Sequence, residues 1–239
     1  MNLNISPYAF NAYSSILRVP KKLTFGAYTQ SPVQNTNSDY KNIDLTNPNL
    51  AKAWHELDDV QFAPEDIRHV QQMGAVMPFK SGHDAIEFMK ANNIRLCFAP
   101  LSSPHIHAQY DDSKKLVEIN ALYKDSTSLA DITAIAGAIM HEMGHAKDKD
   151  GVSSVQEEMD CLAMNALADR AFVRKYGMLN SDSLIVKDGT REYAKLFFDS
   201  DPSHKALIER LKVKYGSLAA GGPKHPPSKI PLAVKSNSP

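Results

Sequence analysis

The segment HEMGH, residues 141–145, constrains this chain more than any other part of its sequence. At about 100° per residue, an α-helix places His141 and His145 one turn apart on the same face, where both imidazoles can reach one ion. Glu142 then lies beside that ion rather than on it. The apolar run AGAIM immediately before the motif predicts a buried helix around it. The segment therefore predicts a helix with a metal site on one face.

The spacing of this motif favours Zn²⁺ and a hydrolytic reaction. A catalytic zinc usually has three protein ligands and an open fourth position. In such a site Glu142 takes a proton from the zinc-bound water and passes it to a leaving amine, while the ion polarises the scissile carbonyl. We therefore expect one catalytic Zn²⁺ and hydrolysis of peptide bonds. The longer pattern HExxHxxGxxH is absent, because Asp148 and Gly151 occupy its last two defined positions, and this disfavours a metzincin.

The third zinc ligand is expected on the next helix, within QEEMDCLAMNAL. Asp160 projects with the apolar face of that helix and needs a partner there, for which a metal or a metal-bound histidine is suitable. Glu157 lies on the flank of the same face and is also the expected capping-box partner of Ser154. Glu158 projects from the opposite face and is expected to be solvated. Glu157 and Asp160 are thus a pair, one binding zinc and the other orienting a ligand, and the pattern does not decide which.

The remaining periodicity predicts an α+β fold with a small sheet and a mainly helical remainder. IRLCFAP and KLVEINALY are short β-rich runs separated by a polar turn, and they predict strands of one small sheet. KLVEINAL is expected to be an edge strand that holds an extended substrate by strand addition. Helical patterns account for most other segments, including the active-site helix, which a capping Ser128 opens.

Composition allows one sizeable core with polar segments at both ends. Of the 239 residues, 43% are hydrophobic and 23% are charged, as in globular proteins. The ends are rich in Asn, Ser, Thr and Pro without apolar periodicity, which is typical of disorder. The expected parts are a disordered leader, a helical layer packed on the core, a catalytic domain and a disordered tail, at residues 1–45, 46–95, 96–217 and 218–239.

Charge balance and the absence of long apolar runs bear on the partners and the compartment of the protein. Lys plus Arg and Asp plus Glu are equal at 27, so no overall field favours nucleic acid. No apolar run approaches the roughly 18 residues of a membrane span, and the N-terminus lacks a signal-peptide pattern. Cys97 and Cys161 are expected to be reduced. We expect a cytoplasmic protein, or one exported without a conventional signal peptide, that acts on protein or peptide substrates. No pattern indicates an oligomeric state.

The order of KLVEINALY, HEMGH, QEEMDCLAMNAL and HKALIERL resembles the peptidase domain of the HtpX and CAAX-prenyl-protease family of gluzincins. The resemblance covers residues 95–215 and implies a zincin fold with zinc-dependent proteolysis. It implies that Asp160 matches the family's supporting Asp. His204, a further catalytic candidate, matches a closing segment near the cleft, where it could stabilise an oxyanion.

One position departs from the pattern of this family. The residue four before Asp160 is Gln156, where the family has a glutamate ligand, and a neutral amide is a poor substitute for a carboxylate on zinc. Glu157 can substitute through a shifted helix, Asp160 can bind directly, or the site can be degenerate. A degenerate site would make the chain a non-catalytic zincin-like binding module. The polar leader suggests a further alternative, a secreted effector or toxin protease.

Overall fold

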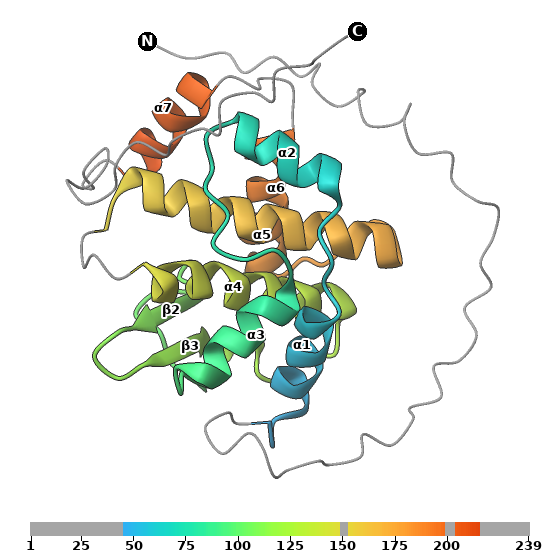
Figure 1. The fold of residues 1–239 in the computed structure, drawn as a ribbon. Coiled ribbons are helices and arrows are strands. Elements are labelled where there is room, and N and C mark those ends of the chain that lie inside the picture. Colours follow the sequence, from blue (N-terminus) through green and yellow to red (C-terminus); the bar gives the residue numbers. More distant parts are fainter. Residues whose placement is uncertain (1–44, 149–152, 199–203, 216–239) are drawn as a thin grey trace, which may run out of the picture. The chain divides into compact units, whose positions relative to one another are not determined.

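The described part of the chain comprises three N-terminal helices, a small sheet and a helical remainder, which Figure 1 shows as a ribbon. This computed structural model describes residues 45–148, 153–198 and 204–215. Nearly all of the expected leader, and all of the expected tail, lie outside the described residues. Among the described helices, none combines the length and the apolar character that a membrane span requires.

Three short strands form one mixed sheet, as the α+β prediction requires: β1 (Arg95–Ala99), β2 (Ala108–Asp111) and β3 (Leu116–Asn120). β3 is central and pairs in parallel with β1 and antiparallel with β2. The expectation that KLVEINAL is an edge strand is therefore wrong, because β3 has a partner on both sides. The open edge nearest α4 belongs to β2. Its sequence AQYD is too short and too polar to predict a strand, so pairing with β3 stabilises it.

The three N-terminal helices confirm the predicted helical patterns: α1 (Pro48–Asp58), α2 (Pro64–Gln72) and α3 (Gly82–Ala91). Side-chain caps define where two of them begin. The side chain of Asn47 accepts hydrogen bonds from the first turn of α1, and Ser81 accepts one from the backbone N–H of Asp84 in α3. A proline occupies the first turn of α2, where its missing N–H costs little.

Two long helices lie side by side at the centre of Figure 1: α4 (Leu129–Lys147) and α5 (Val155–Tyr176). Ser128 caps α4 as predicted, and Ser154 and Glu157 form a reciprocal capping box on α5. The helices run antiparallel and approach closely at Gly144. A Cβ at this position would lie 2.5 Å from Cys161 Sγ, so only glycine permits the contact.

A single hydrophobic cluster joins these elements. Its fully buried members come from the sheet and from all of the described α-helices, and they include Trp54, Val70, Ile119, Ile139 and Phe197. The helical layer expected over residues 46–95 therefore shares its core with the segment expected to be catalytic. A 3-10 turn, η2 (Ala121–Tyr123), connects β3 to α4. After α5 come a π-helical turn, η3 (Ile185–Thr190), and two helices, α6 (Arg191–Phe198) and α7 (His204–Lys214).

Candidate metal centre

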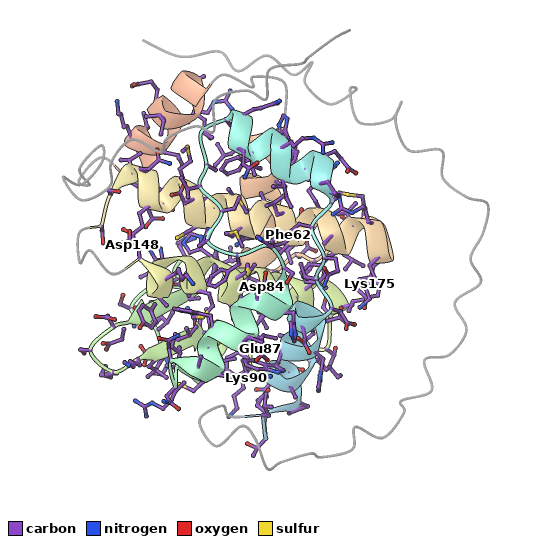
Figure 2. The ribbon with its side chains drawn as sticks, viewed as in Figure 1. Phe62, Asp84, Glu87, Lys90, Asp148 and Lys175 are labelled. Carbon is purple, nitrogen blue, oxygen red and sulfur yellow. The ribbon has the colours of Figure 1, made fainter. Side chains whose placement is uncertain are left out.

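Three potential ligands converge between the C-terminal end of α4 and the first turn of α5. His141 Nε2 and His145 Nε2 lie 3.2 Å apart. Glu158 places one oxygen 3.7 Å from His141 Nε2 and the other 3.6 Å from His145 Nε2. The group lies at the end of α4 that Asp148 marks in Figure 2. It is the one cluster of metal-ligating side chains found among the described residues.

The spacing and chemistry of this donor set fit zinc. Two donors at 2.0–2.1 Å from a tetrahedral zinc ion lie about 3.3 Å apart, and the two Nε2 atoms are 3.2 Å apart. Glu158 approaches the two histidines through different oxygens, at 3.7 and 3.6 Å, and one donor atom from each residue lies within 4.8 Å of the others. Two imidazole nitrogens and one carboxylate oxygen also match a common set of catalytic zinc ligands. The two facing Nε2 atoms need either a proton on one of them or a cation bound by both. All three residues retain some solvent exposure.

Glu157 orients His145 and lies outside the three-ligand group. Its Oε1 is 2.6 Å from His145 Nδ1, and its Oε2 accepts a hydrogen bond from the Ser154 backbone N–H. Because a carboxylate only accepts, His145 Nδ1 bears a hydrogen, which leaves Nε2 as the nitrogen that could bind a metal ion. Burial lowers the pKa of His145, but contacts with Cys161 and Glu157 raise it more.

Asp160 is bound elsewhere. Its Oδ1 accepts hydrogen bonds from the Val76 backbone N–H at 2.8 Å and from Gln156 Nε2 at 2.9 Å. Gln156 Nε2 also donates to the Gly74 carbonyl. Residues two apart on a helix point about 200° from one another, so Asp160 faces away from His141 and His145 when Glu158 faces them. Gln156 and Asp160 therefore fix the 74–76 segment to α5, and Asp160 does not join the ligand group.

The expectation that Glu158 is solvated is wrong, since its side chain is only 13% exposed. The projection failed because α5 is buried around most of its circumference, so apolar residues do not identify the face that meets α4. A usable signal was present in the sequence. The Ser154 capping box commits Glu157 to the start of the helix, and this leaves Glu158 as the carboxylate available to zinc.

Glu142 is buried next to the ligands, as the motif predicts. Burial raises the pKa of its carboxyl to about 7, and the charge of Glu158 adds to the increase. His145 and a backbone hydrogen bond from Tyr110 in β2 oppose it. A carboxyl with this pKa can both accept and donate a proton near neutral pH.

The open edge of β2 lies beside Glu142. The Asn120 backbone N–H donates to the His107 carbonyl, which sets the alternation of the antiparallel ladder. Ala108 and Tyr110 are then the residues whose backbone groups point away from β3. The hydrogen bond from Tyr110 to Glu142 agrees with this alternation. β2 therefore presents outward backbone groups next to the candidate general base.

His204, the second catalytic candidate, is the first residue of α7. Its side chain lies outside the described residues, so its proposed contact with the site stays a prediction. No protein-family model, curated protein or solved structure matches the chain. The likeness to zincin peptidases therefore rests on the motif and the site alone.

Proposed function

We propose that this protein is a zinc-dependent hydrolase that cleaves peptide bonds, with His141, His145 and Glu158 as the metal ligands. The convergence of these three donors beside a buried Glu142 is the observation that supports the proposal. Glu158 replaces both Glu157 and Asp160 as the third ligand. Because Leu162 lies four residues after Glu158, the Glu-x-x-x-Asp pair of the gluzincins is not reproduced here.

The residues of the chain have distinct parts in this proposal. A bound zinc ion would polarise a carbonyl group and lower the pKa of water. Glu142 accepts the proton of the attacking water and returns it to the departing amine, for which a pKa of about 7 is suitable. Glu157 holds His145 in the tautomer that presents Nε2 to the ion.

The edge of β2 is the proposed binding surface for substrate. An extended peptide can add to an open strand through backbone hydrogen bonds, and the outward groups of Ala108 lie along the strand from the Tyr110–Glu142 contact. Ala108→Pro removes one outward N–H and leaves the ladder with β3 intact. We expect this variant to fold and bind zinc normally but to have a raised KM. An unchanged KM would contradict strand addition.

One of the two alternatives to this function has lost part of its basis. The non-catalytic module depended on Gln156 as a lost ligand, but Gln156 binds Gly74 and Asp160 while Glu158 supplies the carboxylate. The effector hypothesis depends on the leader, nearly all of which lies outside the described residues, so it stays a prediction.

A cleavage assay tests the function: the zinc-loaded protein is incubated with an unfolded protein and with a peptide library. We expect cleavage by the wild type, and at least a 100-fold loss in Glu142→Gln, which keeps all three ligands and should bind zinc normally. Absence of zinc-dependent cleavage, or equal rates in the two proteins, would contradict the proposal.

A further inference from the structure

Asn165 of α5 is buried and polar, and no contact explains it. Its side chain is 3% exposed, and its Oδ1 has no hydrogen-bond partner among the described residues. An amide oxygen removed from water without a partner costs free energy, so its presence in the core requires a reason. The sequence pattern alone predicts no role for Asn165.

The register of the helices places Asn165 near the ligands. Asn165 follows Glu158 by seven residues, which is nearly two full turns, so both lie on the same side of α5. Gly144 meets Cys161 where the helices approach, and the helices run antiparallel. Asn165 lies one turn after Cys161 in α5, and His141 lies about one turn before Gly144 in α4. Asn165 and His141 therefore lie at the same level of the helix pair.

A histidine that binds an ion through Nε2 has a hydrogen on Nδ1, and a fixed acceptor for that hydrogen strengthens the metal site. Glu157 provides this acceptor for His145. His141 directs its Nε2 toward His145 and Glu158, so its Nδ1 is the nitrogen that needs an acceptor of its own when the ion binds.

We propose that Asn165 is a positioning residue of the metal centre, whose Oδ1 accepts the Nδ1 hydrogen of His141 when Zn²⁺ is bound. The proposal rests on the proposed function for its metal, but not on peptide hydrolysis. It assigns the two ligand histidines different acceptors, a carboxylate for His145 and an amide for His141. The uncharged acceptor adds no further negative charge beside Glu142, Glu157 and Glu158.

Zinc affinity and metal-free stability, measured together on the full chain, test this proposal. Affinity is measured by competition of Zn²⁺ with a chromophoric chelator, and stability by thermal unfolding in excess chelator. Asn165→Leu keeps the branched shape of the side chain but removes the acceptor, so zinc should bind about 10- to 100-fold more weakly. The metal-free variant should unfold at the same or a higher temperature, because a buried polar group without a partner has been removed.

Two further variants separate positioning from a structural role. Asn165→Asp keeps an acceptor and should bind zinc at least as tightly as the wild type, whereas its metal-free form should unfold at a lower temperature at pH 8. Thr133→Val, a buried polar residue of α4 bonded within its own helix, should leave zinc affinity unchanged.

The proposal would be overturned if Asn165→Leu bound zinc as tightly as the wild type, or if its metal-free form unfolded at a clearly lower temperature. Asn165 would then have no part in the metal centre, or would maintain the fold. A wild type that binds zinc without cleaving any peptide would refute the proposed function and leave this inference intact. A wild type that binds no zinc would refute both.

Discussion

Replacing Glu142 by Gln should make the metal-free protein more stable at alkaline pH, although the same change should abolish activity. Burial raises the pKa of this carboxyl from 4.5 to about 7 in the folded state. The folded protein therefore binds the proton more tightly than the unfolded chain does. Stability is lost as the pH rises from the unfolded pKa to the folded one, and the loss is complete above both.

The magnitude follows from the shift in pKa. At 1.36 kcal/mol per unit, a rise from 4.5 to about 7 corresponds to about 3 kcal/mol, of which about 2.5 kcal/mol appears between pH 5 and pH 8. Glutamine cannot ionise and avoids this cost. We expect the difference in unfolding free energy between Glu142→Gln and the wild type to grow by about 2.5 kcal/mol, in favour of the variant, over this interval.

Urea unfolding in excess chelator at pH 5 and pH 8 measures the difference. Glu65→Gln in α2 is a suitable control, because Glu65 makes the same chemical change at an exposed position. Its difference from the wild type should vary much less with pH. A stability difference between Glu142→Gln and the wild type that is independent of pH would refute the assignment of a buried carboxyl with a raised pKa.

Three other substitutions test the contact between α4 and α5, the cap of α5 and the orientation of His145. Gly144→Ala should destabilise the protein by about 1–3 kcal/mol and weaken zinc binding, because its Cβ would clash with Cys161 between the two ligand helices; urea unfolding and zinc titration check this, and wild-type stability would contradict it. Ser154→Ala should cost about 1 kcal/mol in urea unfolding through loss of the helix cap, and no change would show that the cap is dispensable. Glu157→Gln should reduce zinc affinity about 10- to 100-fold in a chelator competition, since a neutral amide orients His145 less strongly; unchanged affinity would refute that role.

The sequence was informative where local chemistry alone determines structure. The helix around HEMGH, its Ser128 cap and the Ser154 capping box depend on neighbouring residues, and the structure contains all of them. The close approach at Gly144 likewise depends on the absence of a side chain at that position. Such features need no knowledge of distant segments.

Features that depend on tertiary contacts were missed or misassigned. β2 exists because β3 lies beside it, and its four residues show no strand pattern of their own. Asp160 was expected near the metal because it projects with apolar residues, yet its partner is the backbone of Val76, 84 residues earlier in the chain. Glu158 was misplaced for the same reason, since both faces of α5 are covered and only the packing against α4 selects one of them.

The most direct test of the central claim is the zinc content and zinc affinity of the purified chain, measured with two matched substitutions, Glu158→Gln and Asp160→Asn. Each replaces a carboxylate of α5 by its own amide, so size and helix position are preserved. The proposed centre predicts about one zinc per wild-type chain, loss of that zinc in Glu158→Gln, and near-normal binding in Asp160→Asn. Absence of zinc from the wild type, or loss of zinc through Asp160→Asn with Glu158→Gln unaffected, would contradict it.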